Sequence, residues 1–255
     1  IYLQVLANFA NDYGDYKKGT DGPERSDRAM ASGDISEHEM KRALIATSVK
    51  AFIVGCITLG FAFDFIFSMI YGVLILGGLG VLSILAALRY TIGRNAYGYK
   101  GLGDAYVILF FGYIGVLGVA YLLSHSFQLS WLMPATFSGF MAAAVLNLNN
   151  LRDHENDALS GKNTLVVRLG FKQAKRYHVG IIITGWVLLL IFLFGAGELI
   201  EWRGGIWYVL IAFIHLKHIV FVMQNKDPKL LDPELKKISL TSFVVALFMI
   251  LSVTV

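Results

Sequence analysis

The sequence predicts an all-α protein whose helices cross a membrane several times. Hydrophobic residues make up 56% of the 255 residues and charged residues only 16%, whereas globular proteins carry about 25% charged residues. Several stretches of about 18–22 residues are almost free of charge, which is the length that crosses about 30 Å of hydrocarbon as a helix. Because no segments of about ten residues alternate in polarity, a helical bundle is expected.

The apolar stretches define the expected elements in order. The expected spans are 43–63, 67–88, 105–123, 131–150, 178–197, 205–223 and 238–255. The apolar run 1–10 resembles the inner end of a further helix, so we expect a single membrane domain over 1–255 that is incomplete at its N-terminus. Before the first full span, Ser36 and Glu39 form a capping-box pattern, which predicts that this helix begins near residue 37.

Lysine and arginine residues indicate the orientation of these spans. The segments 13–42, 89–104, 151–177 and 225–237 hold 19 of the 22 Lys and Arg residues, and they are alternate loops between the expected spans. By the positive-inside rule these loops face the cytoplasm. The sequence pI of about 9.0 therefore requires no nucleic-acid partner, because membrane topology and an anionic substrate both account for it.

The first basic loop begins with amides and acids, in the sequence "NFANDYGDYKKGTD" at 8–21. Asn8, Asn11, Asp12 and Asp15 are spaced by three and four residues, so on a helix they share one face. Like charges at this spacing destabilise a helix by a few tenths of a kcal/mol per pair. A bound cation is therefore expected to compensate them.

A later basic loop, "NLNNLRDHENDALSGKNTL" at 147–165, repeats the arrangement. Its Asn149 and Asp153 have the spacing of Asn11 and Asp15, and Asp157 follows one turn later. The pattern indicates an internal repeat of two halves with about four helices each, and each half presents acids at one helix end. Two such clusters on one membrane face form an oxygen-rich site, which suits Mg²⁺ bound together with substrate phosphates.

Basic and aromatic side chains on the same side are candidates for binding a diphosphate. The candidate cations are Lys18, Arg28, Arg94, Lys100, Arg152 and Lys162. The middle loop at 90–104 adds Tyr90, Tyr97, Tyr99 and Asp104, and tyrosines beside a phosphate site can shield a developing cation or orient an aromatic ring. Positive-inside topology and an interfacial aromatic belt remain alternative explanations for these residues.

These motifs resemble those of the UbiA superfamily of intramembrane prenyltransferases. "NDYGDYKKGTD" at 11–21 is similar to the first aspartate-rich motif of that family, and "NNLRDHENDALSGKNTLVVRLG" at 149–170 is similar to the second. "YTIGRNAYGYKGLGD" at 90–104 resembles the Tyr/Lys middle loop, with Tyr90 and Arg94 at the Y-x3-K positions. Within the superfamily, the chain most resembles the MenA-type 1,4-dihydroxy-2-naphthoate polyprenyltransferases of menaquinone synthesis.

The resemblance implies a fold of two four-helix repeats plus one helix, with the N-terminal helix missing from this chain. It also implies the transfer of a polyprenyl group from polyprenyl diphosphate to 1,4-dihydroxy-2-naphthoate, with decarboxylation to demethylmenaquinone, at the cytoplasmic side of a bacterial inner membrane. The implied catalytic residues are Asp12, Asp15, Asp153, Asp157 and Tyr90. The implied Mg²⁺ ligands are Asp12, Asp15, Asp21, Asp153 and Asp157. The implied diphosphate-binding residues are Asn8, Asn11, Lys18, Arg28, Arg94, Lys100, Asn149, Arg152 and Lys162.

The sequence departs from the family pattern and leaves some questions open. Where the first motif commonly has its last acid, this chain has Gly19, and the acid follows at Asp21. The acceptor of the ring-hydroxyl proton is open among Tyr90, Tyr97, His154 and Asp104. Alternative functions are a prenyltransferase for another aromatic acceptor, such as 4-hydroxybenzoate or homogentisate, and, in another class, a cation transporter.

Overall fold

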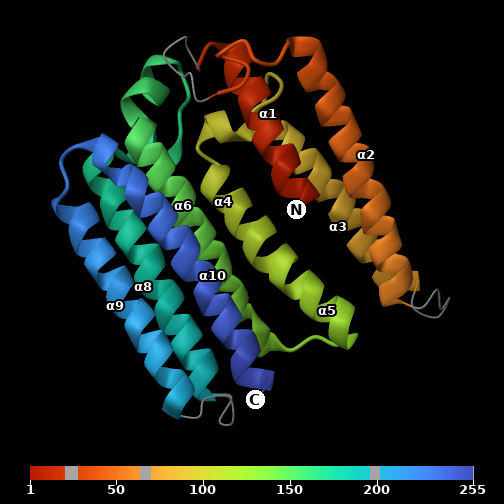
Figure 1. Cartoon of the computed structure of the whole chain (residues 1–255), viewed down its shortest axis with the longest axis vertical. Coiled ribbons are helices and arrows are strands. Elements are labelled where there is room, and N and C mark those ends of the chain that lie inside the picture. The colour runs from red at the N-terminus through yellow and green to blue at the C-terminus, as the bar shows by residue number, and fades with distance from the viewer. Residues whose placement is uncertain (21–27, 64–69, 196–201, 255) are drawn as a thin grey trace. The chain divides into compact units, whose positions relative to one another are not determined.

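The computed structural model describes residues 1–20, 28–63, 70–195 and 202–254, except for the side chains of 202–205 and 250–254. The described residues form helices and no strand (Figure 1). The α-helices are α1 (Tyr2–Lys18), α2 (Glu37–Ala62), α3 (Ile70–Arg89), α4 (Gly103–Val107), α5 (Gly118–Ser124), α6 (Leu132–Leu159), α7 (Leu165–Leu169), α8 (Phe171–Gly195), α9 (Trp202–Gln224) and α10 (Asp232–Thr254). Short 3₁₀ turns are η2 (Tyr97–Lys100), η4 (Leu129–Trp131) and η5 (Pro228–Leu231), and η3 (Ile108–Leu117) is a π-helix.

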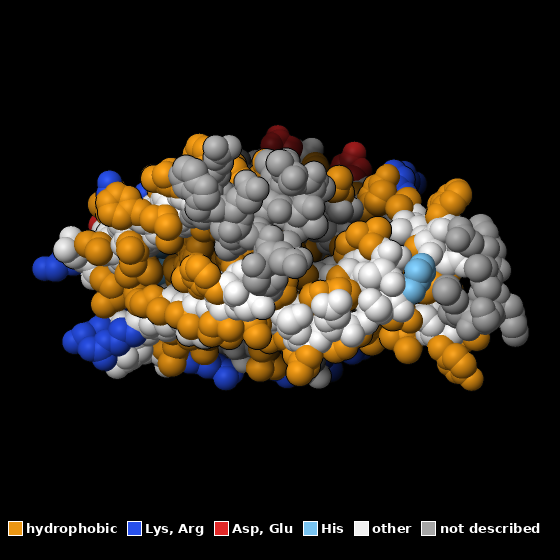
Figure 2. Space-filling view, turned by 90° about the horizontal axis from the view of Figure 1, so that it is seen from below, with side chains coloured by type: hydrophobic (Ala, Val, Ile, Leu, Met, Phe, Trp, Pro, Cys, Tyr) orange, Lys and Arg blue, Asp and Glu red, His pale blue; other side chains and the backbone are white. Residues whose placement is uncertain are grey.

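The predicted class, a multi-span helical bundle, is confirmed. Six helical segments in the described part of the chain are long and apolar enough to cross a membrane: 37–62, 70–89, 103–124, 129–159, 171–195 and 206–224. The seventh expected span lies in α10. Residues 67–69, 196, 197 and 255 of the expected spans lie outside the described residues. Figure 2, which views the structure from below, shows many hydrophobic side chains, and the few charged ones lie toward the edges of the view.

The chain forms two compact units. Unit 1 comprises residues 1–103 and 156–164, and unit 2 comprises residues 104–155 and 165–255. Helix α6 therefore begins in unit 2 and ends in unit 1. That both units belong to one membrane domain stays a prediction.

In unit 1, helices α1, α2 and α3 pack on one another around a small core. Leu6, Ala10, Met30, Met40 and Leu44 are the buried residues of this core. The predicted capping box is present, since the Ser36 hydroxyl accepts from the backbone of Glu39 and the Glu39 carboxylate accepts from the backbone of Ser36. The polar ends of α1 and α2 also meet, because Lys17 Nζ lies 3.1 Å from Glu37 Oε2.

In unit 2, helices α6, α8, α9 and α10 share a large apolar core that includes Leu148, Ile182 and Val245. A buried polar chain joins α8, α9 and α10 within it: His178 Nε2 lies 2.8 Å from His218 Nε2, and His218 Nδ1 lies 2.5 Å from Glu234 Oε2. The sequence places His218 late in a span, where polar groups usually face the protein interior, and the structure agrees. Interhelical hydrogen bonds of this kind hold membrane helices together.

The π-helix η3 and helix α6 approach each other at two glycines. A Cβ on Gly112 would lie 2.6 Å from the carbonyl oxygen of Ala135, and a Cβ on Gly139 would lie 2.9 Å from that of Ile108. Both neighbours are backbone atoms, which cannot rotate away as a flexible side chain can. The two helices therefore pack backbone to backbone, as small residues allow in membrane proteins.

Because of this contact, we predict that Gly112→Ala destabilises the protein. Overpacking a tight contact costs about 1–3 kcal/mol, so the melting temperature in detergent should fall by several degrees. Gly180→Ala on α8 is the matched control, since a Cβ there meets nothing within 4 Å, and it should leave the melting temperature nearly unchanged. Equal melting temperatures for the two variants would contradict the close approach of η3 and α6.

Candidate active site

The first acid motif lies at the C-terminal end of α1. The helix ends at Gly19, whose φ of 70° is the left-handed conformation that glycine adopts without strain. The N–H groups of Gly19 and Thr20 donate to the carbonyls of Tyr16 (3.1 Å) and Asp15 (3.0 Å). This is a Schellman cap, which satisfies the last carbonyls of the helix and fixes the direction of the chain after Asp15.

The second acid motif ends in the same way at the C-terminus of α6. Gly161 has a φ of 73°, its N–H donates to Ala158 (3.2 Å), and the N–H of Lys162 donates to the carbonyl of Asp157 (2.8 Å). The two caps are 142 positions apart in the sequence, so Asp15 occupies the same position in the first cap as Asp157 in the second, and Thr20 the same position as Lys162. The sequence spacing Asn-x3-Asp pairs Asp15 with Asp153 instead, one helical turn earlier. The caps thus set a register for the repeat that the acid spacing does not reveal.

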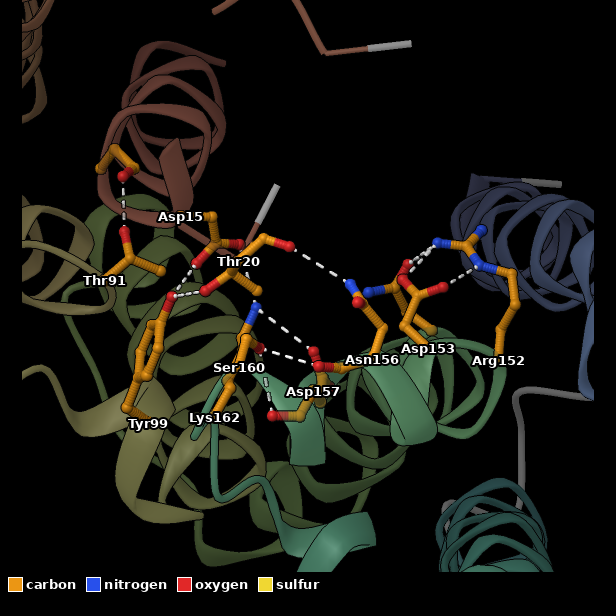
Figure 3. A network of polar contacts seen from close by, with 12 residues as sticks. Asp15, Thr20, Thr91, Tyr99, Arg152, Asp153, Asn156, Asp157, Ser160 and Lys162 are labelled. Atoms are coloured by element: carbon orange, nitrogen blue, oxygen red, sulfur yellow. Dashed lines mark hydrogen bonds and ion pairs between the residues drawn. The ribbon is translucent and has the colours of Figure 1, made fainter. Parts of the chain in front are cut away.

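Lys162 connects the two acid motifs within unit 1. Its ammonium donates to Asp15 Oδ2 at 3.0 Å and lies 4.0 Å from Asp157 Oδ1 (Figure 3). The side chains of Asp15, Asp157 and Lys162 are only 3%, 5% and 10% exposed. Carboxylates at a helix C-terminus are unfavourable because that end carries partial negative charge, so the lysine compensates both charges. The structure therefore brings three predicted site residues, Asp15, Asp157 and Lys162, into one buried cluster.

Tyr99, expected from the sequence only as one of the tyrosines of the middle loop, lies at the site, whereas the family resemblance favours Tyr90. The Tyr99 hydroxyl donates to Asp15 Oδ1 at 2.7 Å and lies 2.5 Å from the Thr20 hydroxyl. The ammonium of Lys18 lies 3.6 Å from the centre of the Tyr99 ring, a close cation–π contact. Burial, together with the neighbouring Asp15 carboxylate, raises the pKa of the Tyr99 hydroxyl, so this group stays a hydrogen-bond donor. The signal in the sequence was the cluster of tyrosines in the middle loop, and this cluster alone does not identify which tyrosine contacts the acid.

Asp12 lies one helical turn before Asp15 on α1 and contacts residues 28–30. The backbone N–H groups of Ala29 and Met30 donate to its carboxylate, and the Arg28 guanidinium lies close enough to lower its pKa. Burial has the larger effect, and the pKa of Asp12 is raised above its usual value. The oxygens Asn11 Oδ1 and Asp12 Oδ1 are buried acceptors to which no group in the described part of the chain donates.

Unit 2 holds the remaining residues of the second motif. The Arg152 guanidinium donates to both carboxylate oxygens of Asp153 (2.8 Å each), to Asn149 Oδ1 (2.8 Å) and to Asp232 Oδ1 on α10 (2.6 Å). Arg152 thereby fixes the side chains of Asn149 and Asp153 from α6. This fork geometry is one that arginine provides and lysine does not.

Other predicted residues have different surroundings. Asn8 accepts from Gln4 (3.4 Å), Lys100 donates to Asn95 (2.9 Å), and Arg94 is exposed. Tyr90 packs edge-on against Tyr97, with ring centres 5.4 Å apart. Asp21 lies outside the described residues.

The three other candidates for accepting a ring-hydroxyl proton also have defined contacts. The Tyr97 hydroxyl donates to the carbonyl of Ala86 (2.9 Å), and His154 Nδ1 lies 2.8 Å from the carbonyl of Leu151. Asp104 is buried, and the hydroxyl of Tyr177 donates to its carboxylate. Asp104 Oδ2 accepts no hydrogen bond from the described residues.

The donor set of unit 1 fits a divalent cation that binds together with a phosphate. In the described part of the chain, no group of three or more His, Cys, Asp and Glu side chains is placed to hold a metal ion unaided. Mg²⁺ is usually held by one or two carboxylates, waters and substrate phosphates. The acids of the two motifs and the unpaired oxygens of Asn11 and Asp12 supply such a partial site.

Comparisons with known proteins define the class of this chain. The UbiA prenyltransferase family matches residues 1–240, so the chain belongs to this family of prenyltransferases. It is similar to the 1,4-dihydroxy-2-naphthoate octaprenyltransferases of three bacteria. Identity is 42% over 247 residues for Haemophilus influenzae (96% of this chain, 78% of that protein) and 44% over 238 for Escherichia coli (92% and 75%). For Mycobacterium tuberculosis it is 30% over 195 residues (76% and 63%). These findings confirm the family resemblance of the motifs. No solved structure matches the chain significantly.

We predict that Tyr99→Phe weakens the site without abolishing the fold. A hydrogen bond to a charged group contributes about 1.5–3 kcal/mol, so losing the donor to Asp15 should slow prenyl transfer about tenfold or more and lower the melting temperature. The matched control is Tyr16→Phe, which changes an exposed tyrosine on the same helix as Asp15. A normal rate for Tyr99→Phe would show that Tyr99 does not position the Asp15 carboxylate.

Proposed function

We propose that this protein transfers a polyprenyl group from polyprenyl diphosphate to 1,4-dihydroxy-2-naphthoate, with loss of CO₂, in menaquinone biosynthesis. The observation that carries the proposal is the Asp15–Lys162–Asp157 cluster, in which acids from both motifs meet around one cation. Relatives at 42% and 44% identity that bear the name 1,4-dihydroxy-2-naphthoate octaprenyltransferase support the choice of acceptor.

The residues of unit 1 suit the recognition of a diphosphate. Lys18 and Lys162 place two ammonium groups beside the Tyr99 ring, 3.6 and 5.5 Å from its centre, and both can donate to phosphate oxygens. The carboxylates of Asp12, Asp15 and Asp157 are proposed to hold Mg²⁺ against the same diphosphate. Asp153, which lies in unit 2, stays a predicted ligand on the evidence of its motif. Bound there, Mg²⁺ would neutralise charge on the leaving diphosphate. The lysines assist the departure of the diphosphate from the allylic carbon because they stabilise the charge that develops on it.

A bond then forms between the electron-rich ring carbon of the acceptor and the allylic carbon that the diphosphate has left, while a ring hydroxyl loses its proton. The ring carboxylate leaves as CO₂ and the ring oxygen regains a proton, which restores the aromatic diol. Among the candidates for accepting the hydroxyl proton, Asp104 has a buried carboxylate oxygen that accepts nothing from the described residues, and Tyr177 holds its other side. This observation favours Asp104, whereas Tyr97 and His154 already bond backbone carbonyls. The polyprenyl tail is proposed to lie among the apolar helices.

The proposed location is the bacterial inner membrane, with the active-site loops on its cytoplasmic side. Within each unit the basic segments gather at one end of the helices: Lys17 pairs with Glu37 in unit 1, and Arg152 pairs with Asp232 in unit 2. The positive-inside rule assigns such ends to the cytoplasm.

Two alternatives predict different products. A prenyltransferase for 4-hydroxybenzoate or homogentisate would use the same diphosphate site with another ring. A cation transporter would place its acids near the membrane midplane on broken helices, whereas Asp15 and Asp157 lie at the ends of α1 and α6. The helix-end position of the acids therefore favours the enzyme.

The direct test is to identify the product. The full-length protein in lipid vesicles is incubated with Mg²⁺, a labelled polyprenyl diphosphate and each aromatic acid in turn, and products are identified by mass. We expect demethylmenaquinol from 1,4-dihydroxy-2-naphthoate, detected as demethylmenaquinone after oxidation by air, together with release of CO₂. Both should be lost when EDTA removes Mg²⁺. Prenylation of 4-hydroxybenzoate or homogentisate alone would assign the other acceptor, and ion flux without any prenylated product would refute the enzyme.

We further predict that Asp15→Asn and Asp153→Asn each lower the rate of prenyl transfer at least about 100-fold, since each removes a negative charge that is proposed to hold Mg²⁺. Both proteins should still be expressed in the membrane. Glu155→Gln is the matched control, because Glu155 is an exposed acid on the same helix as Asp153. Wild-type rates in both aspartate variants would exclude a role for the acid motifs.

A further inference from the structure

The cluster of unit 1 already contains a cation between its two acid motifs, and this cation belongs to the chain. We propose that Lys162 makes the site select a metal–diphosphate complex over the free metal ion. The ammonium occupies the position between Asp15 and Asp157 in the absence of ligand, and moves to the diphosphate when metal and diphosphate arrive together. This inference rests on the proposed function.

The contacts of Lys162 place its ammonium beside both acids, with a hydrogen bond to Asp15 and an ion pair with Asp157. It lies 3.0 Å from Asp15 Oδ2, 4.0 Å from Asp157 Oδ1 and 5.5 Å from the centre of the Tyr99 ring (Figure 3). Its side chain is only 10% exposed. A buried ion pair with so little contact with water is screened weakly by salt. The positive charge of the Lys162 ammonium therefore strongly repels any second cation that binds beside it.

The backbone around Lys162 is fixed, while its side chain is free to change partner. The N–H of Lys162 donates to Asp157 (2.8 Å), and its carbonyl accepts from Thr164 (3.0 Å). Beyond this anchor, lysine carries its charge on a flexible four-carbon stem. The ammonium can therefore leave the carboxylates without any change in the cap of α6.

Two consequences follow for binding. A free divalent cation would have to bind the same carboxylates as the Lys162 ammonium. Because the two positive charges repel and a buried ion pair must be broken, the free metal ion binds weakly. A diphosphate offers the ammonium new acceptors, which lowers the cost of its departure. Metal and diphosphate therefore strengthen each other's binding, and linkage makes this coupling reciprocal. Replacing Lys162 by a neutral residue should tighten the binding of metal alone and weaken that of diphosphate.

The test measures metal binding directly, without turnover. Mn²⁺ alone is titrated into the purified full-length protein, and bound Mn²⁺ is followed by electron paramagnetic resonance. We expect Lys162→Met and Lys162→Gln to bind Mn²⁺ at least about tenfold more tightly than the wild type. With saturating Mn²⁺, both variants should bind labelled inorganic pyrophosphate at least about tenfold more weakly. The control Lys236→Met, which removes an exposed charge in unit 2, should match the wild type in both assays.

The melting temperature with and without Mn²⁺ is a second measurement of metal binding, which also serves if the Lys162 variants are less stable than the wild type. Mn²⁺ should raise the melting temperature of the Lys162 variants more than that of the wild type, because stabilisation by a ligand grows with its affinity. If the Lys162 variants bind Mn²⁺ no more tightly than the wild type while the wild type still forms prenylated product, the selection mechanism is wrong and the proposed function stands. If the wild type forms no prenylated product from any acceptor, the proposed function fails and this inference fails with it.

Discussion

The ion pairs of Lys162 with Asp15 and Asp157 are the interaction on which the site depends. Each acid motif ends a helix, where the helix dipole disfavours carboxylates, and Lys162 of the second motif brings a cation close to the acids of both. Because Lys162 follows the cap of α6 and reaches Asp15 at the end of α1, it joins segments almost 150 residues apart in sequence. The Tyr99 hydroxyl donates to the other carboxylate oxygen of Asp15 and also contacts the hydroxyl of Thr20, which follows the cap of α1.

The two halves of the repeat use the same local device for different purposes. A glycine in the left-handed conformation ends both helices and turns the next residue back toward the acids. After Gly19 that residue is Thr20, whose hydroxyl contacts Tyr99; after Gly161 it is Lys162, which contacts Asp15. A duplicated cap therefore gives an asymmetric site, with neutral oxygens on one side and a cation on the other.

The sequence allows the fold class and much of the site to be predicted, and physical reasons explain the rest. Long apolar segments determine the helices, and Ser36 with Glu39 determines where α2 begins. Hydrophobicity does not distinguish an α-helix from a π-helix, so η3 was not foreseen, nor was its contact with α6 at Gly112 and Gly139. The acids and lysines were found by spacing and charge. The contact of Tyr99 with Asp15 was not predicted, because it depends on how the middle loop folds back on α1, which no local pattern encodes.

The central claim is that one lysine links the two acid motifs in the absence of ligand. The most direct measurement is a cryo-electron microscopy structure of the full-length, metal-free protein in lipid nanodiscs. We expect the Lys162 ammonium within hydrogen-bonding distance of Asp15, with the Asp157 carboxylate beside it and the Tyr99 hydroxyl on the other oxygen of Asp15. A structure in which Lys162 points to solvent and the carboxylates of Asp15 and Asp157 share no cation would contradict it.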